Sequence, residues 1–315
     1  MIIWVIGAGG LLGSEVIACA RGRGDTVFAC TPVPWADPGQ TVETIRTDAF
    51  ALRRRLSEPS HLNSRWGIVW AAGHATTSSS EEQTGRELET FRSSLRAIND
   101  VLSTTPGGTL VLASSAGGVY AGGSNPPFTS QSDEAPLGVY GRLKVAQERA
   151  AREILNPSIA VLITRIANLY GPGQDLSKLQ GLISRLALTS VTKQPLTMFV
   201  PLDTLRDFIT ANDAAQRLIH WLDTDNQRLS VRVIASGQAV SLGYVINVLK
   251  DITRTATPIA YGIHASAVYQ SADLRLTPDL NDTIKSLPLT PLPVGIKEVY
   301  DDILKRHQDG LCPVV

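Results

Sequence analysis

The chain has 315 residues, of which 43% are hydrophobic, and its 29 basic and 29 acidic side chains cancel at neutral pH. This length and apolar content suffice for one large core or two smaller ones, so we expect an ordinary soluble globular protein. The balanced charge leaves no basic surface of the kind that binds nucleic acid, so nucleic acid is not expected as a partner. Three cysteines, odd in number and far apart, favour reduced thiols and a cytoplasmic location over a disulfide framework.

Membrane segments and metal sites are not expected either. The apolar opening Met1–Ile6 is too short for a secretory signal and lacks a basic flank. No window approaches the roughly 18 apolar residues that a membrane-spanning helix needs. The five histidines are scattered without the spacing of a metal site, so no metal is predicted.

Taken in chain order, short apolar runs alternate with longer stretches of helical composition. The strand-like runs are Ile2–Ile6, Thr26–Cys30, Gly67–Ala71, Thr109–Ala113, Ala160–Thr164 and Val231–Ala235. The expected helices between them include Leu12–Arg21, Glu81–Leu102 and Tyr140–Ile154. Buried strands that alternate with helices form parallel sheets covered on both faces. We therefore predict an α/β fold with a doubly wound parallel sheet of the Rossmann type.

The composition of the sequence changes after about Asn168. A Gly-Pro-Gly segment at 171–173, a helix-like run at Leu179–Leu188 and many later prolines make this part less regular. We predict a dinucleotide-binding domain formed by residues 1–170 with 205–237, and a smaller C-terminal substrate-binding domain formed by residues 171–204 with 238–315.

A glycine-rich segment follows the first strand directly and opens a helix. Glycines let the chain turn sharply and bring backbone amides against a pyrophosphate, which the positive helix N-terminus also attracts. This context favours dinucleotide binding over a purely structural turn. The expected cofactor contacts are Gly7, Gly9, Gly10, Leu11, Leu12 and Gly13.

The second strand ends near Thr31 without the acidic residue that usually holds the ribose of NAD, so the choice between NAD and NADP stays open. Thr31 can lie near a ribose or near a 2′-phosphate, which Arg21 or Arg23 would neutralise. Asp48, expected after a third sheet-edge segment, has two interpretations. It accepts a hydrogen bond from the adenine amino group, or it is the N-cap of a helix at Ala49–Leu56.

The next strand ends in the small residues Ala71, Ala72 and Gly73. Small residues allow close approach of a ribose or a nicotinamide, although tight packing of a helix on the sheet requires the same residue types. Their place at the carboxyl end of a strand favours contact with the cofactor.

Tyr140 and Lys144 stand one helical turn apart, so their polar ends can reach the same ligand. A free phenol has a pKa near 10, and a neighbouring ammonium and a positive nicotinamide favour the phenolate, which can then act as a base. Lys144 can also bond the nicotinamide ribose. Ser114 and Ser115 follow a buried strand, and a serine hydroxyl can hold a substrate oxygen. Only one of two neighbours on an extended segment faces the ligand, and Ser115 is preferred.

Several motifs together resemble the extended short-chain dehydrogenase/reductases, specifically the NAD-dependent nucleotide-sugar epimerase/dehydratase family. They are the glycine loop, Trp70-Ala-Ala-Gly73, Ser114-Ser-Ala-Gly-Gly-Val-Tyr120, Tyr140-Gly-Arg-Leu-Lys144, Arg165-Ile-Ala-Asn168-Leu-Tyr-Gly-Pro-Gly173 and Leu205-Arg206-Asp-Phe-Ile209. The resemblance implies that Ser115, Tyr140 and Lys144 are catalytic. It also implies that Asn168 and Arg206 bind the diphosphate of a nucleotide sugar, while Ser115 binds the substrate at the reacting oxygen.

Two departures from the family pattern bear on the reaction. The catalytic hydroxyl often lies four residues before the Val-Tyr tyrosine, a position that is Ala116 here, which leaves Ser115 for the role. The dehydratases of the family place an Asp-Glu pair beside that hydroxyl, whereas this chain has Ala116-Gly117. A dehydratase is therefore disfavoured.

We accordingly predict a nucleotide-sugar 4-epimerase that uses NAD or NADP, with NAD favoured, and oxidises a sugar hydroxyl transiently before reducing it again. The alternatives are an NADPH-dependent reductase of a nucleotide keto-sugar and a non-catalytic dinucleotide-binding protein. Resemblance also implies a homodimer in which Glu81–Leu102 and Tyr140–Ile154 form a four-helix bundle with their copies.

Overall fold

The computed structural model describes residues 1–177, 181–256, 258–262 and 270–312. Its centre is a six-stranded parallel sheet in the order β10-β5-β4-β3-β1-β2. The strands are β1 (Ile2–Ile6), β2 (Thr26–Val27), β3 (Trp66–Trp70), β4 (Gly108–Ser115), β5 (Ile159–Ile166) and β10 (Leu229–Ile234). The chain winds outward from β1 to β2, then crosses to β3 and winds the other way. The predicted doubly wound fold is confirmed, and the reversal between β1 and β3 opens the crevice where such sheets bind ligands.

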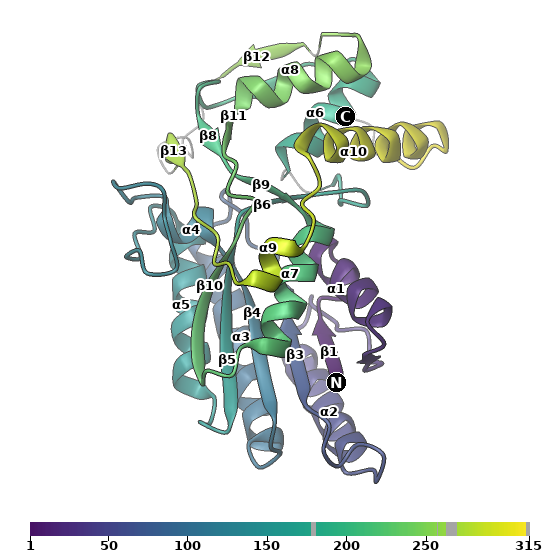
Figure 1. The fold of residues 1–315 in the computed structure, drawn as a ribbon, viewed down its shortest axis with the longest axis vertical. Coiled ribbons are helices and arrows are strands. Elements are labelled where there is room, and N and C mark those ends of the chain that lie inside the picture. Colours follow the sequence, from purple (N-terminus) through teal and green to yellow (C-terminus); the bar gives the residue numbers. More distant parts are fainter. Residues whose placement is uncertain (178–180, 257, 263–269, 313–315) are drawn as a thin grey trace.

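Helices cover both faces of this sheet (Figure 1). On one face lie α1 (Leu11–Gly22) and α7 (Ala211–Thr224), and on the other lie α2 (Pro38–Leu56), α3 (Glu81–Leu102) and α5 (Val139–Ile154). The fully buried β1 shows why both faces need cover, because its side chains alternate between the two cores: Ile3 and Val5 join one, and Ile2, Trp4 and Ile6 join the other.

The expected third sheet-edge segment before Asp48 is wrong. Residues 38–56 form the single helix α2, which begins after the N-cap Asp37, whose carboxylate accepts the Gln40 backbone N–H. Its buried residues are Thr41, Ile45, Asp48, Ala49, Leu52 and Leu56. This spacing is helical, and the β-branched residues around Ile45 gave a misleading strand signal. Asp48 lies inside the helix and is not the N-cap of a helix at Ala49–Leu56.

The second predicted strand, Thr26–Cys30, is shorter in the structure and ends at Val27. The edge position of β2 offers a partner on one side only, and the prolines at 32 and 34 prevent a longer ladder. The peptide after β2 keeps one further sheet-like bond, from the Phe28 N–H to the Ile3 carbonyl, and the chain then leaves as a loop.

The rest of the chain lies above the carboxyl ends of the central strands (Figure 1). Here α6 (Leu182–Thr192), α8 (Leu242–Thr253) and α10 (Leu292–Gln308) enclose a separate apolar cluster. The small strands are β6 (Asn168–Tyr170), β7 (Leu196–Met198), β8 (Leu205–Arg206), β9 (Phe208–Thr210), β11 (Val240–Ser241), β12 (Ile259–Tyr261) and β13 (Asp273–Leu274). The short helices are α4 (Ala116–Tyr120) and α9 (Asp282–Ser286).

The division into two domains stays a prediction. Strand β8 falls in the stretch assigned to the first domain, yet it pairs with β11 and β13 in the smaller three-stranded sheet. The first residues of the predicted helix Leu179–Leu188 lie outside the described residues, and α6 begins at Leu182.

Among the described residues, no helix is long and apolar enough to cross a membrane. Within the residues that the structure describes, no group of three or more His, Cys, Asp or Glu side chains is arranged to hold a metal ion.

Candidate active site

The glycine loop joins β1 to α1 and forms a tight cradle. Gly7 has φ +93°, and a Cβ there would lie 2.7 Å from the Ala72 backbone nitrogen. A Cβ on Gly13 would collide with the Gly7 carbonyl, and the Gly10 N–H donates to that carbonyl at 3.0 Å. No described side chain caps the N-terminus of α1 at Gly10. The first N–H groups of α1 therefore remain available to an anion, which fits a dinucleotide pyrophosphate.

The end of β3 lies directly against this loop. Ala71 donates its N–H to the Ile6 carbonyl at 2.8 Å, and the Ala72 backbone packs on Gly7. Gly73 follows, and the position of a Cβ on it would lie 3.9 Å from Lys144 Nζ. The predicted contacts of the glycine loop and of Ala71–Gly73 thus lie together at the reversal point of the sheet, where sheets of this kind bind ligands.

Thr31 and Asp48 are brought together in a way that the sequence did not reveal. The Thr31 N–H and hydroxyl each donate to a different oxygen of the Asp48 carboxylate, both at 2.9 Å. Asp48 is only 4% exposed, and its carboxylate anchors the loop after β2 through Thr31. Arg23 pairs with Asp25 and Asp223 at the far end of α1, away from the glycine loop.

Tyr140 and Lys144 lie in the first turns of α5, which begins at Val139. Lys144 Nζ lies 5.8 Å from the centre of the Tyr140 ring and donates to the Ala113 carbonyl at 3.5 Å. The Tyr140 ring packs on Gly118, where a Cβ would lie 3.1 Å from its Cε1. The ring is half-buried, so it lies neither in the core nor in bulk solvent.

The two adjacent serines at the end of β4 point in different directions. The Ser114 hydroxyl donates to Glu148 Oε1 at 2.6 Å inside the protein. The Ser115 hydroxyl accepts the Gly118 N–H at 3.1 Å as the N-cap of α4, beside the Gly118 backbone on which Tyr140 packs. The pleat of β4 therefore separates a hydroxyl that is used internally from one that lies near the Tyr140 ring.

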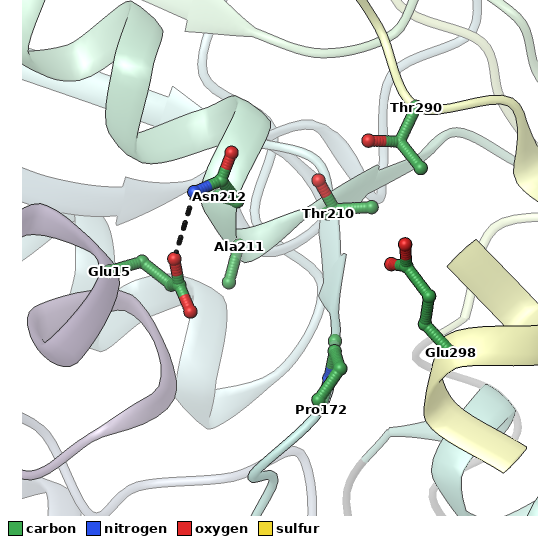
Figure 2. A pocket seen from close by; sticks show the side chains of 8 residues that line it. Glu15, Pro172, Thr210, Ala211, Asn212, Thr290 and Glu298 are labelled. Carbon is green, nitrogen blue, oxygen red and sulfur yellow. Dashed lines mark hydrogen bonds between the residues drawn. The ribbon is translucent and has the colours of Figure 1, made fainter. Parts of the chain in front are cut away.

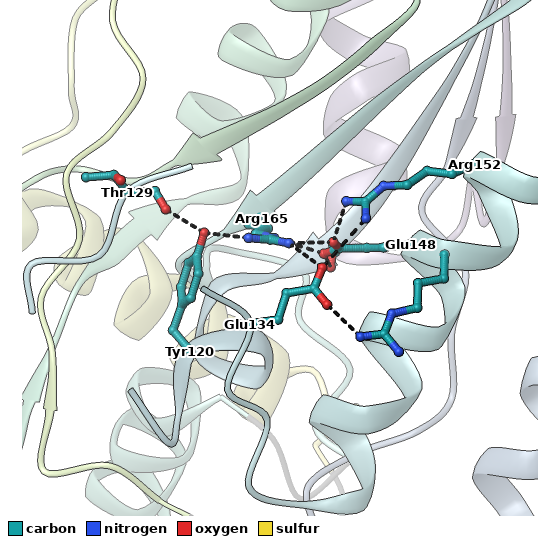
Figure 3. A network of polar contacts seen from close by, with 8 residues as sticks. Tyr120, Thr129, Glu134, Glu148, Arg152 and Arg165 are labelled. Atoms are coloured by element: carbon teal, nitrogen blue, oxygen red, sulfur yellow. Dashed lines mark hydrogen bonds and ion pairs between the residues drawn. The ribbon is translucent and has the colours of Figure 1, made fainter. Parts of the chain in front are cut away.

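Behind Ser114 is an ion-pair network, shown in Figure 3, that the sequence analysis did not anticipate. Arg165 on β5 donates to both oxygens of Glu148, to Glu134 and to the Tyr120 hydroxyl. Glu148 is fully buried and carries the charge that raises the pKa of Arg165 despite burial. Glu148 lies on the buried face of α5, one turn after Lys144. A charged residue on that face is the sequence feature that indicates a buried ion pair. The network fixes α5 and the loop before it against the sheet.

The predicted substrate residues Asn168 and Arg206 lie close together above the sheet. Asn168 donates its backbone N–H at 3.0 Å and its Nδ2 at 2.9 Å to the carbonyl of Asp207, the residue after Arg206. Arg206 is 8% exposed, and Nη1 donates to the Leu205 carbonyl. Burial lowers the pKa of Arg206 to about 10, against the opposing effect of Asp273. A largely buried cation in this position suits a bound anion.

A small cavity of about 180 Å³ lies elsewhere, between α1, α7 and α10 (Figure 2). Its lining is Glu15, Gly171, Pro172, Thr210, Ala211, Asn212, Thr290 and Glu298. Asn212 Nδ2 donates to Glu15 Oε2 at 3.0 Å across one wall. None of the predicted site residues lines it.

The fold, with its glycine loop and the Tyr140–Lys144 helix, is that of a dinucleotide-binding enzyme of the short-chain dehydrogenase/reductase type. A profile of the NAD dependent epimerase/dehydratase family matches residues 3–235, and the chain belongs to that family.

Individual relatives match over shorter stretches. A dTDP-L-rhamnose 4-epimerase of Burkholderia thailandensis is 30% identical over 119 residues, which are 37% of this chain and 33% of that protein. A dTDP-4-dehydro-6-deoxyglucose reductase of Escherichia coli is 30% identical over 146 residues, 45% of this chain and 44% of that protein. The matches thus span less than half the length of these curated relatives.

A solved structure, MoeE5 in complex with UDP-glucose and NAD, has a TM-score of 0.74 and 22% sequence identity, and the superposition covers 99% of this chain and 100% of that one. At this identity the likeness establishes the shared fold.

Proposed function

We propose that this protein is an NAD-dependent nucleotide-sugar 4-epimerase. The observation that carries the proposal is the placement of Tyr140, Lys144 and the Ser115 side of β4 around the crevice that also holds the glycine loop and Gly73. Tyr140 takes the proton of the sugar hydroxyl, because the Lys144 ammonium beside it stabilises a phenolate. Ser115 holds the same oxygen by a hydrogen bond through both the alcohol and the ketone.

The chain offers the groups that a bound dinucleotide needs, in the cradle formed by Gly7, Gly13 and the start of α1. NAD bound there would supply a hydride acceptor that returns the hydride to the other face of the sugar. Arg206 and Asn168 would bind the diphosphate, which leaves the sugar ring free to turn over between the two hydride transfers.

We favour NAD over NADP because Asp48 places a buried negative charge directly behind Thr31. A 2′-phosphate near Thr31 would be repelled by this charge. Arg23, one of the two arginines considered as partners of that phosphate, is engaged with Asp25 and Asp223.

The second candidate is an NADPH-dependent reductase of a nucleotide keto-sugar, and the match to the Escherichia coli reductase favours it. Ser115, Tyr140 and Lys144 would then catalyse the reduction of a ketone, in which Tyr140 donates its proton to the ketone oxygen. A non-catalytic role is less favoured, because a protein without chemistry has no need of a Lys144 that is only 8% exposed beside an accessible tyrosine.

A homodimer through α3 and α5 and a cytoplasmic location are part of this proposal. The exposed positions of these helices are largely charged, among them Arg86, Glu89, Arg96, Arg142 and Arg149. A bundle on this face would rely on ion pairs, so sedimentation at low and high salt tests it. The three cysteines are free thiols, which suits a reducing compartment.

The reaction is tested by supplying purified protein with UDP- and dTDP-linked hexoses and analysing the products. Inversion at C4 without added cofactor supports the epimerase, and consumption of NADPH by a 4-keto sugar supports the reductase. Tyr140→Phe is expected to abolish either activity while NADH still binds, and Tyr300→Phe on α10 is the matched control. Full activity of Tyr140→Phe in a protein that binds NADH would overturn both candidates.

A further inference from the structure

A carboxylate on α3 reaches into the crevice beside Lys144. Glu87 Oε2 accepts the backbone N–H of His74 at 2.9 Å and that of Ala75 at 2.8 Å. Its other oxygen, Oε1, accepts from Gln147 Nε2 at 3.4 Å. Glu87 therefore anchors the loop that follows Gly73 and joins it to α5.

Gln147 continues this connection to Lys144. Its side-chain carbonyl accepts from Lys144 Nζ at 3.2 Å, while its amide nitrogen donates to Glu87. Gln147 is only 1% exposed, so water cannot replace either partner easily. These two partners fix the orientation of the Gln147 amide, because the carboxylate can only accept a hydrogen bond and the ammonium can only donate one.

The charge of Glu87 is not used elsewhere. No ion pair within the described part of the chain includes this carboxylate, which is half-buried. A Cβ on Gly73 would lie 3.2 Å from Glu87 Oε1 and 3.9 Å from Lys144 Nζ, so both groups lie against the same point of the backbone. The Glu87 carboxylate and the Lys144 ammonium, which is only 8% exposed, therefore lie on the same side of the loop after β3 and are joined through Gln147.

We propose that Glu87, acting through Gln147, positions the Lys144 ammonium and tempers its field at Tyr140, and so couples the loop after β3 to the catalytic helix. Glu87 and Gln147 are positioning residues, and the inference rests on the proposed function of Tyr140 and Lys144. The coupling means that the contact of this loop with the dinucleotide and the strength of the base at Tyr140 are set by the same side chain.

Two variants separate the positional effect from the electrostatic effect. Glu87→Gln removes the charge and also breaks the connection, because its single carbonyl is taken by the two backbone amides and its NH2 group then faces the NH2 group of Gln147. Gln147→Leu removes the connection at similar volume without changing a charge. Glu89→Gln, on the same helix and 65% exposed, makes the same chemical change away from the crevice and is the control.

The measurements are the pH profile of kcat/KM with the nucleotide sugar that gives turnover, and the Kd for NADH. In Glu87→Gln we expect kcat to fall about tenfold through misplacement of the ammonium. We expect the acid limb of the profile to move to lower pH, because the ammonium then lacks a nearby negative charge. NADH should bind severalfold more weakly, since a neutral amide oxygen holds the two backbone amides of the loop less strongly than a carboxylate does. Gln147→Leu should lose rate with the acid limb unmoved.

A folded Glu87→Gln protein with the rate, acid limb and NADH affinity of Glu89→Gln would overturn the inference. A move of the limb to higher pH would overturn its electrostatic part. These outcomes are distinguishable from a failure of the proposed function, which fails only if Tyr140→Phe stays active. An inactive Tyr140→Phe together with an unchanged Glu87→Gln would remove this inference alone.

Discussion

The hydroxyl of Ser114 donates to Glu148 Oε1 at 2.6 Å in the interior, so Ser114 is part of the packing of α5 against the sheet. Its neighbour Ser115 points to the other side of β4, where its hydroxyl accepts the Gly118 N–H. The two serines should therefore respond to the same substitution in different ways.

We expect Ser114→Ala to lower the free energy of unfolding by about 2 kcal/mol, because the buried Glu148 loses a donor. Its kcat should change less than about threefold if Ser114 does not touch the reacting atoms. Ser115→Ala should lower kcat about a hundredfold, since a hydrogen bond to the reacting oxygen is lost, and should cost about 1 kcal/mol as a lost helix cap. Denaturant unfolding and initial rates on both variants check this. Equal loss of kcat in the two variants would contradict the assignment of Ser115.

The buried Arg206 gives a pH dependence of ligand binding. Burial lowers its pKa from the ordinary arginine value to about 10, so the folded protein releases this proton at a lower pH than the unfolded chain. Between about pH 10 and the ordinary arginine pKa the unfolded state binds more protons, and the cost that the buried charge imposes on folding is relieved as pH rises through this window. The charge is needed for an anion, so affinity for UDP should fall as pH rises through about 10.

Titration of UDP by calorimetry at pH 8 and near pH 10 measures this effect, which is set by the shifted pKa of about 10. Arg206→Met should weaken UDP binding by about 2 kcal/mol, roughly thirtyfold in Kd. It should also remove the pH dependence, while NADH binding stays unchanged. A variant that binds UDP normally would place the diphosphate site elsewhere.

Two glycines of the loop separate folding from cofactor binding. Gly7→Ala should lower stability by several kcal/mol, because its φ is +93° and a Cβ would lie 2.7 Å from the Ala72 nitrogen. A Cβ on Gly9 meets nothing within 4 Å, so Gly9→Ala should leave the thermal midpoint unchanged. It should weaken NADH binding, since the added methyl group occupies space beside the expected pyrophosphate. Normal NADH affinity in Gly9→Ala would count against the position of the pyrophosphate.

Asp48→Asn tests the cofactor preference. The substitution removes the negative charge behind Thr31 while an oxygen remains to accept one of its two donors. We expect the ratio of the Kd values for NADPH and NADH to fall about tenfold. Asp100→Asn, at an exposed position 60% accessible to solvent, is the control. If the ratio is the same in both variants, the charge of Asp48 does not select the cofactor.

The sequence alone determined those features that depend on local chemistry. Helix α3 runs over the predicted Glu81–Leu102 because Ser80 and Gln83 form a capping box at its start. The doubly wound parallel sheet follows from the alternation of apolar runs with helical segments, and this prediction is confirmed. The one-turn separation of Tyr140 and Lys144 is likewise a property of helical spacing.

Only the tertiary structure decided which polar groups meet. Asp48 belongs to a buried helix face and binds Thr31, 17 residues earlier, and nothing in the local sequence marks that contact. Glu87 and Gln147 stand 60 residues apart, and Ser114 finds Glu148 across 34 residues. Such contacts arise from the packing of α2, α3 and α5 on one face of the sheet, where burial forces each polar atom to find a partner. The spacing of apolar residues indicates which face of a helix is buried. Which polar group becomes a residue's hydrogen-bond partner depends on how the elements are aligned with one another, and this alignment is fixed only when the whole core packs.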